Sequence, residues 1–292
     1  MNPWLTVPPC TPGACAVHEG RTAPLPLALL RLTALAAAVL LGLAAAAPVR
    51  LLAPRTRTRL VRLWCTALLR TLGLRIRVHG SPGPDGGRLV VANHISWLDV
   101  PLVAAVLPGR MLAKGEVGRW PVLGPLAARA GTLFIDRDRL RALPGTVATL
   151  ARALRAGSRV VVYPEGSTWC GRAAGPFRPA AFQAALDAAV PVQPVHLAYR
   201  LDGGGLATAP AFVGEDPLTA SLWRIARARG VTAEIRLLPR IPAGRHPDRK
   251  ALARAAQSAV AVARDNANRP CSSVHHRVSS SPAAASSART PS

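Results

Sequence analysis

His94 and Asp99 are the pair of residues in this chain best suited to chemistry. They enclose the sequence Ile-Ser-Trp-Leu and follow the apolar run of residues 88–92. Residues five positions apart on one continuous helix lie about 140° apart around its axis, so the two side chains would not meet. If a turn joins a strand to a helix here, Asp99 can accept a hydrogen bond from one imidazole nitrogen. The other nitrogen of His94 is then a general base for a hydroxyl group.

Short apolar runs alternate with helical patterns between residues 75 and 242. The runs predict strands over residues 89–92, 132–135, 159–163, 192–198 and 233–238. The helical patterns cover residues 100–106, 139–156, 179–189 and 217–229. This alternation predicts an α/β domain with a largely parallel sheet flanked by helices. In such sheets, ligands bind at the carboxyl ends of the strands.

Polar residues follow three of the predicted strands at that end. His94 follows the first, Arg137 the second, and the run Glu165, Gly166 and Ser167 the third. Because parallel strands end at the same edge of a sheet, we expect a base, a guanidinium group and a Glu-Gly turn to meet there.

The formal charge of the 292-residue chain is +23, and nearly all of its cations are arginines, since the only lysines are Lys114 and Lys250. Such a charge suggests an anionic partner, either nucleic acid or an anionic membrane, although a general bias toward Ala and Arg accounts for part of it. A membrane-anchored nucleic-acid-binding protein is therefore one alternative. No zinc finger, helix-turn-helix or RNA-recognition motif supports it, so no nucleic-acid partner is expected.

The cysteines are five in number and lack the paired spacing of metal ligands. We therefore expect neither a disulfide framework nor a metal site.

The amino-terminal quarter predicts a membrane anchor. Residues 1–24 read as a disordered leader, and residues 25–48 as a membrane segment in which Arg31 could reach the interface. A signal peptide is the alternative, because residues 44–47 are all alanine. Against it, eight arginines and no acidic residue lie within residues 50–77. By the positive-inside rule, the following domain is expected on the cytoplasmic side of the cell membrane.

Three further parts complete the predicted organisation. Residues 49–78 read as a basic amphipathic helix that contacts an anionic membrane, or alternatively as an ordinary surface helix packed on the core. Residues 79–267 form the catalytic domain. Residues 268–292 are rich in Ser, Pro and Ala and are expected to be a disordered tail.

Four blocks of the sequence resemble the glycerolipid acyltransferase family, which includes the bacterial 1-acylglycerol-3-phosphate acyltransferases. They occupy residues 93–99, 131–137, 163–168 and 190–195, in the family's order. The resemblance implies transfer of a fatty acyl group from acyl-coenzyme A or acyl carrier protein to a lysophospholipid hydroxyl. The first acceptor it suggests is 1-acyl-sn-glycerol-3-phosphate, and no cofactor is needed. His94 would be the general base, with Asp99 stabilising its imidazolium form.

The same resemblance implies how the acceptor binds. Arg137 would contact its phosphate, with help from Arg178, and the block containing Glu165, Gly166 and Ser167 would position it. Family members often carry a lysine at the position of Lys114.

The third block departs from the family, because many members have Glu-Gly-Thr-Arg where this chain has Glu-Gly-Ser-Thr, ending at Thr168. The missing arginine leaves open another lysolipid acceptor, such as lyso-ornithine lipid. An esterase with Ser167 as nucleophile is a further alternative, but the second glycine of a nucleophile elbow is missing.

Overall fold

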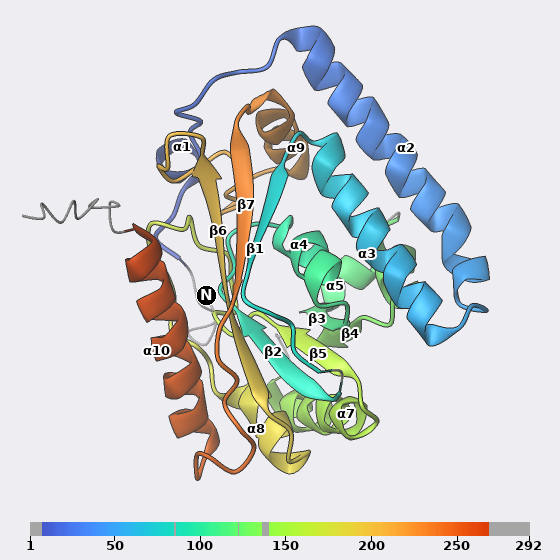
Figure 1. Ribbon diagram of the computed structural model, residues 1–292, viewed down its shortest axis with the longest axis vertical. Coiled ribbons are helices and arrows are strands. Elements are labelled where there is room, and N and C mark those ends of the chain that lie inside the picture. Colours follow the sequence, from blue (N-terminus) through green and yellow to red (C-terminus); the bar gives the residue numbers. More distant parts are fainter. Residues whose placement is uncertain (1–7, 85, 122, 136–139, 269–292) are drawn as a thin grey trace, which may run out of the picture.

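A seven-stranded sheet organises the protein, and helices cover both of its faces (Figure 1). The computed structural model describes residues 8–84, 86–121, 123–135 and 140–268. The strands are β1 Arg75–His79, β2 Arg88–Ala92, β3 Arg110–Lys114, β4 Leu133–Ile135, β5 Arg159–Val162, β6 Val192–Leu201 and β7 Val231–Leu237. Their order in the sheet is β1-β7-β6-β2-β5-β3-β4. Neighbouring strands are parallel except β6 and β7. The predicted largely parallel α/β fold is therefore confirmed.

The central strand β2 explains why the core has two halves. Its five residues are all buried, as expected for a parallel strand covered on both faces. Val90 and Ala92 belong to the apolar cluster on one face, and Leu89 and Val91 to the cluster on the other. This alternation follows from the two-residue period of a strand, which points successive side chains to opposite faces.

Helices supply the remaining core on each face. The first face is covered by α3 Pro54–Thr71, α4 Asp99–Val106 and α9 Leu218–Arg227, and the second by α7 Leu143–Arg155, α8 Ala180–Asp187 and α10 Arg249–Asn268. The shorter elements are α1 Pro12–Cys15, α5 Gly115–Gly118, α6 Leu123–Arg129 and η1 Leu140–Ala142. The helices predicted around residues 100–106, 139–156, 179–189 and 217–229 correspond to α4, α7, α8 and α9.

Two antiparallel helices form a hairpin at the edge of the molecule (Figure 1). The first, α2 Leu25–Val49, is long and apolar enough to cross a membrane, and only 11% of its most apolar window is buried. The indole N–H of Trp64 on α3 donates to the Ala38 carbonyl oxygen at 2.8 Å. Gly42 makes room for this contact, since a Cβ atom there would lie 2.4 Å from the Trp64 ring. The partner helix α3 buries Cys65 and Leu69 against the core and leaves Leu63 exposed.

Arg31, for which the sequence suggested a place at the membrane interface, is hydrogen-bonded to another helix of the protein. Its guanidinium group donates to the carbonyl oxygens of Ala226 at 2.9 Å and Ala228 at 2.7 Å. These carbonyls lie at the carboxyl end of α9, where a helix leaves its last carbonyl groups without partners and a cation is favourable. Arg31 therefore ties the first turns of α2 to the catalytic domain.

The amino-terminal segment differs from the predicted disordered leader. Residues 8–24 are described and pack on the domain, with Cys10 and Ala16 buried in the core. The Ala23 N–H donates to the Arg227 carbonyl oxygen at 2.6 Å, and the Thr208 hydroxyl donates to the Val17 carbonyl oxygen. Contacts with residues far away in the sequence position this segment, so its own sequence shows no periodic pattern that would have predicted them.

The predicted basic helix over residues 49–78 is also shorter in the structure. Helix α3 ends at Thr71, and β1 begins at Arg75 as an edge strand of the sheet. Of the two apolar residues of β1, Ile76 packs against the core and Val78 is exposed. Strand β3 was likewise not predicted.

Candidate active site

The carboxyl ends of the central parallel strands bring the predicted catalytic residues together. Val91 of β2 pairs in register with Val162 of β5, so the turns that follow these strands are neighbours. His94 follows β2 and Glu165 follows β5. Arg137 lies outside the described residues, so its predicted phosphate contact stays a prediction.

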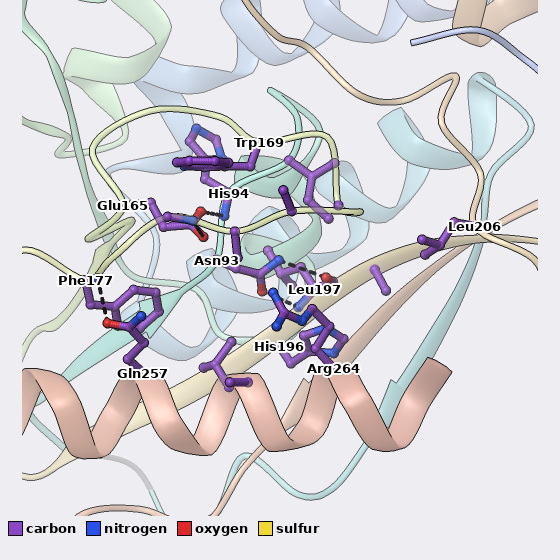
Figure 2. Close-up of a pocket in the computed structure, with 18 residues that line it drawn as sticks. Asn93, His94, Glu165, Trp169, Phe177, His196, Leu197, Leu206, Gln257 and Arg264 are labelled. Atoms are coloured by element: carbon purple, nitrogen blue, oxygen red, sulfur yellow. Dashed lines mark hydrogen bonds between the residues drawn. The ribbon is translucent and has the colours of Figure 1, made fainter. Parts of the chain in front are cut away.

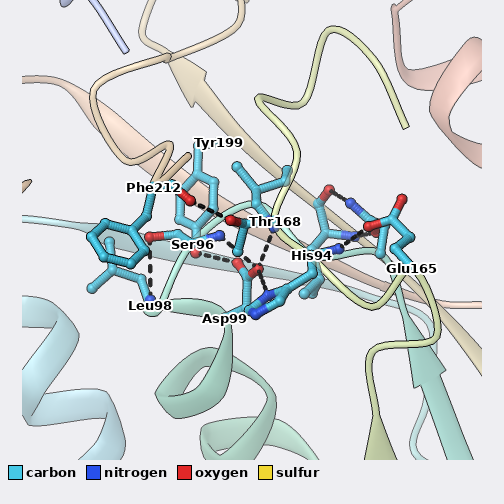
Figure 3. Close-up of polar contacts among 11 residues, drawn as sticks. His94, Ser96, Leu98, Asp99, Glu165, Thr168, Tyr199 and Phe212 are labelled. Carbon is cyan, nitrogen blue, oxygen red and sulfur yellow. Dashed lines mark hydrogen bonds and ion pairs between the residues drawn. The ribbon is translucent and has the colours of Figure 1, made fainter. Parts of the chain in front are cut away.

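A turn between β2 and α4 places the base and its carboxylate side by side (Figure 3). Asp99 is the first residue of α4, and its backbone N–H donates to the Ser96 carbonyl oxygen at 3.1 Å. The His94 Nδ1 atom lies 2.8 Å from Asp99 Oδ2. The structure therefore has the strand-turn-helix arrangement that the spacing of the two residues required.

Asp99 is fully buried and its carboxylate accepts four hydrogen bonds. The donors are His94 Nδ1, the backbone N–H groups of Ile95 at 2.6 Å and Ser96 at 2.9 Å, and the Tyr199 hydroxyl at 2.7 Å. Burial, followed by the Asp99 charge, raises the pKa of Tyr199 well above its ordinary value, so the phenol keeps its proton. Because an ionised carboxylate only accepts hydrogen bonds, His94 Nδ1 carries the ring proton. The His94 Nε2 atom is consequently the basic nitrogen.

The imidazole ring is held on one side and open on another. It stacks on Tyr163 with ring centroids 4.1 Å apart and an interplanar angle of 17°. Its side chain remains 21% exposed, which leaves access to the basic nitrogen. Tyr163 and Tyr199 are the only tyrosines in the sequence, and both contact the His94–Asp99 pair.

Glu165 is buried and binds two backbone N–H groups. Its Oε2 accepts from His94 at 2.7 Å and its Oε1 accepts from Gly175 at 3.1 Å. Burial raises the pKa of Glu165 to about 8, although these two hydrogen bonds oppose the shift. The carboxylate therefore fixes the backbone of His94, and its contact with an acceptor stays a prediction.

The other predicted binding residues lie near the same edge. Gly166 has a φ of +76°, in the left-handed region that favours glycine, and makes the sharp turn after Glu165. Ser167 follows it and is half-buried. Lys114 ends β3 and is exposed, and Arg178 is exposed beyond the loop. Among the described residues that line the His94 cavity, neither cation is present.

A cavity of about 140 Å³ opens beside His94 (Figure 2). Its polar lining includes Asn93, His94, Glu165, Trp169, His196 and Arg264. Asn93 is itself fixed by β6, because its side chain donates to the Leu197 carbonyl oxygen at 3.0 Å and accepts from the Leu197 N–H at 2.8 Å. His94 thus borders a polar cavity that lies between the strand ends and α10.

Two residues of this cavity were not predicted from the sequence. Burial, then the charges of Arg236, Arg200 and Arg264, lowers the pKa of His196 to about 4, so it is neutral near pH 7. Its Nδ1 atom is buried and has no partner among the described residues. Arg264 reaches the cavity from α10, more than 160 positions from His94, and no local pattern marks it.

Comparisons with known proteins agree with this geometry. Residues 75–198 match the sequence model of the family described as Acyltransferase. Over 211 residues, covering 71% of the chain and 79% of the relative, the sequence is 42% identical to a lyso-ornithine lipid O-acyltransferase from Pseudomonas aeruginosa. Over 201 residues, covering 68% and 78%, it is 35% identical to a 1-acyl-sn-glycerol-3-phosphate acyltransferase from Neisseria gonorrhoeae.

A solved structure has the same fold. The crystal structure of the 1-acyl-sn-glycerophosphate acyltransferase from Thermotoga maritima matches with a TM-score of 0.66 and 18% sequence identity. The match covers 83% of this chain and 95% of that chain.

Proposed function

Because the chain belongs to the glycerolipid acyltransferase family, we propose that it transfers a fatty acyl group from a thioester to the free hydroxyl of a lysolipid, with His94 as general base. The family resemblance of the four sequence blocks is confirmed, and the protein is an acyltransferase. The donor is acyl-coenzyme A or acyl carrier protein. The observation that carries the proposal is the 2.8 Å contact between His94 Nδ1 and the buried Asp99 carboxylate, because it leaves Nε2 as the ring nitrogen that can take a proton.

The proposed reaction needs one base and no covalent enzyme intermediate. His94 Nε2 takes the hydroxyl proton while the oxygen attacks the thioester carbonyl carbon. The new C–O bond forms, the C–S bond breaks, and the leaving thiolate receives the proton from the imidazolium. Asp99 stabilises that imidazolium and keeps the ring oriented. A positioned general base contributes about 10²- to 10⁴-fold to such a step.

The cavity favours an acceptor with an anionic head group. Arg264 offers a guanidinium fork, which suits phosphate or carboxylate oxygens, and the neutral His196 offers a buried ring nitrogen beside it. Among the described residues of this lining, Glu165 is the only acidic side chain, its pKa is raised to about 8, and its two oxygens accept hydrogen bonds from backbone N–H groups. Arg137 remains the proposed second phosphate contact, and roles for Lys114 and Arg178 in acceptor binding stay predictions.

The first acceptor we propose is 1-acyl-sn-glycerol-3-phosphate, giving phosphatidic acid. A second candidate, lyso-ornithine lipid, is favoured by one observation at the third block. The Thr168 hydroxyl, at the position where many members carry an arginine, donates to the Phe212 carbonyl oxygen and is not available to a phosphate. The lyso-ornithine lipid O-acyltransferase with 42% identity supports the same alternative.

We further propose that the hairpin of α2 and α3 embeds in an anionic cell membrane, with the catalytic domain on the cytoplasmic side. The exposed leucines of α2 and the hairpin turn, Leu29, Leu30, Leu40, Leu41, Leu51 and Leu52, support membrane contact. Arg31 ties the start of α2 to α9, and α3 leads back into the sheet through β1. Both ends of the hairpin therefore lie on the domain side, which favours embedding over crossing.

An acceptor panel tests the proposed function. Purified protein in detergent would be given 1-acyl-sn-glycerol-3-phosphate, lyso-ornithine lipid or a neutral monoacylglycerol, each with both thioester donors. Transfer to 1-acyl-sn-glycerol-3-phosphate or to lyso-ornithine lipid is expected. His94→Ala should lower this transfer by about 10²- to 10⁴-fold. Undiminished transfer by His94→Ala would contradict the general-base assignment.

Two arginines on α10 allow a matched test of the proposed head-group site. Arg264 lines the cavity, whereas Arg254 on α10 is exposed away from it. Arg264→Gln should raise the KM for the acidic acceptor about tenfold, the loss of roughly one charge-assisted hydrogen bond, and leave the donor KM unchanged. Arg254→Gln should change neither value. Equal effects of the two substitutions would exclude Arg264 from acceptor binding.

A further inference from the structure

Three cysteines that are far apart in the sequence meet outside the His94 cavity. Cys10 precedes the single turn of α1, Cys15 is the last residue of that turn, and Cys170 lies in the loop that follows β5. Their three sulfur atoms all lie within 4.8 Å of one another. We propose that these sulfurs bind one thiophilic divalent metal ion, best matched by Zn²⁺, which joins the amino-terminal segment to the active-site loop. The proposal differs from the expectation of no metal site, which considered only the spacing of the cysteines along the sequence, because the third cysteine comes from a distant segment.

The spacing of the sulfurs fits a single ion. Three sulfurs at about 2.3 Å from a tetrahedral zinc ion are roughly 3.8 Å apart. The observed separations, all within 4.8 Å, are close to that arrangement. The fourth coordination position is then left for water or another small ligand, as in zinc sites with three protein ligands.

The surroundings of the cluster suit thiolate ligands. Cys10 and Cys170 are buried and Cys15 is half-buried, and all three are free thiols. The backbone N–H groups of Ala173 and Arg172 donate hydrogen bonds to the Cys170 sulfur. Gly171, with a φ of +84°, turns the chain so that these N–H groups reach the sulfur.

A disulfide explains the arrangement less well. One disulfide would join only two of the three sulfurs and leave the third without a partner. A zinc ion with three thiolates carries a net charge of −1, which is opposite in sign to the +23 charge of the chain. A metal also uses every member of the cluster.

The site lies where a metal would order the catalytic loop. Trp169, the neighbour of Cys170, donates its backbone N–H to the His94 carbonyl oxygen at 2.7 Å. On the other side, the segment that carries Cys10 and Cys15 continues through Ala23, which is hydrogen-bonded to α9, into α2. A bound ion would thus connect the membrane hairpin's first residues with the loop beside the base.

Metal analysis of the full-length protein tests the proposal independently of acyl transfer. The protein would be purified in detergent under reducing conditions from zinc-supplemented cells, and its zinc measured by mass spectrometry. We expect one zinc per chain, and a several-fold loss in Cys10→Ser, Cys15→Ser and Cys170→Ser. Cys65→Ala is the matched control, because Cys65 is a buried cysteine outside the cluster and should leave the zinc content unchanged.

Cobalt titration of the wild-type protein decides the matter even if the serine variants fail to fold. Metal-depleted wild-type protein should develop thiolate-to-cobalt charge-transfer absorption that saturates at one Co²⁺ per chain. The proposal is overturned if wild-type protein contains no zinc and shows no such absorption. It is also overturned if peptide mapping finds a disulfide among these three cysteines in freshly prepared protein. Neither result depends on whether a lysolipid is acylated.

Discussion

The buried Asp99 carboxylate is the residue on which the proposed chemistry depends most. Besides His94, it accepts two backbone N–H groups and the Tyr199 hydroxyl. These donors come from the turn that follows β2 and from β6, so both strands fix the position of one side chain. The position of the His94 ring is fixed because Asp99 is itself held by backbone N–H groups and by the buried Tyr199 hydroxyl.

Asp99→Asn should abolish most activity with little change in fold. An amide presents both a donor and an acceptor, so the His94 ring can settle with its proton on Nε2, the tautomer that cannot accept a proton from the acceptor hydroxyl. We expect kcat to fall about 10²- to 10⁴-fold. Tyr199→Phe removes only one of four donors to the carboxylate and should cost about 1 to 3 kcal/mol in transition-state stabilisation. A steady-state assay that finds Tyr199→Phe as damaging as Asp99→Asn would contradict this ranking.

Glu165 predicts a particular pH dependence of stability. Burial is the largest cause that raises its pKa from 4.5 to about 8. Between these values the folded protein holds the proton and the unfolded chain releases it. The contribution of Glu165 to the free energy of unfolding is therefore fully present below the unfolded pKa and is lost as the pH rises through the folded pKa.

Thermal unfolding of wild type and Glu165→Gln checks this dependence. Since glutamine does not titrate, the stability of wild type relative to the variant should decrease between about pH 5 and about pH 9, by a few kcal/mol at most. Glu116→Gln, which changes an exposed glutamate on α5, should leave the dependence as it is in wild type. A difference that grows in the opposite direction would show that Glu165 is stabilised as an anion.

At the scale of the elements, buried strands were the part of the fold that sequence predicted best. Strand β2 is wholly apolar after Arg88 because both of its faces are covered, and such runs are distinctive. Strand β1 has the sequence Arg-Ile-Arg-Val-His and is mostly exposed, so its charges read as part of the preceding basic helix. Its place in the sheet comes from pairing with β7, more than 150 residues away.

How far apart the interacting residues lie in the sequence also explains which residues of the candidate site could be predicted. His94, Asp99 and Glu165 were predicted because each lies within a few residues of a recognisable strand. Tyr199, Arg264 and the cysteine cluster reach their places only through the order of strands and the packing of α10 and residues 8–16. No local spacing specifies those contacts.

Gly42 is the element-scale position where a single methyl group should be costly. A Cβ atom there would meet the Trp64 ring at 2.4 Å, and the ring is held by its hydrogen bond to Ala38. Gly42→Ala should destabilise the hairpin by about 1 to 3 kcal/mol through overpacking, despite the better helix propensity of alanine. In a Trp64→Leu background the same substitution should be close to neutral. Thermal unfolding in detergent measures both, and equal losses in the two backgrounds would exclude the steric explanation.

At the scale of the whole molecule, charge and apolar surface occupy the same end of the hairpin. The chain from Arg50 to Arg59 carries four arginines beside the exposed Leu51 and Leu52. An apolar surface binds any bilayer, whereas the arginines add attraction only to an anionic one. On the proposed membrane contact, the large positive charge of the protein would act at an anionic bilayer and would not require nucleic acid.

Vesicle binding separates these contributions and tests the nucleic-acid alternative. The full-length protein, kept soluble in a minimal amount of detergent, should bind anionic vesicles more strongly than neutral ones, and the difference should shrink as salt screens the charges. A Leu40→Glu and Leu41→Glu variant should lose binding to both kinds of vesicle, since these α2 side chains are 63% and 67% exposed. Val262→Glu, at an exposed apolar position on α10, is the matched control and should bind like wild type.

Duplex DNA at moderate salt should not displace the protein from anionic vesicles. If DNA competes effectively and the leucine substitutions have no effect, the charge serves nucleic acid and the hairpin is not the membrane contact.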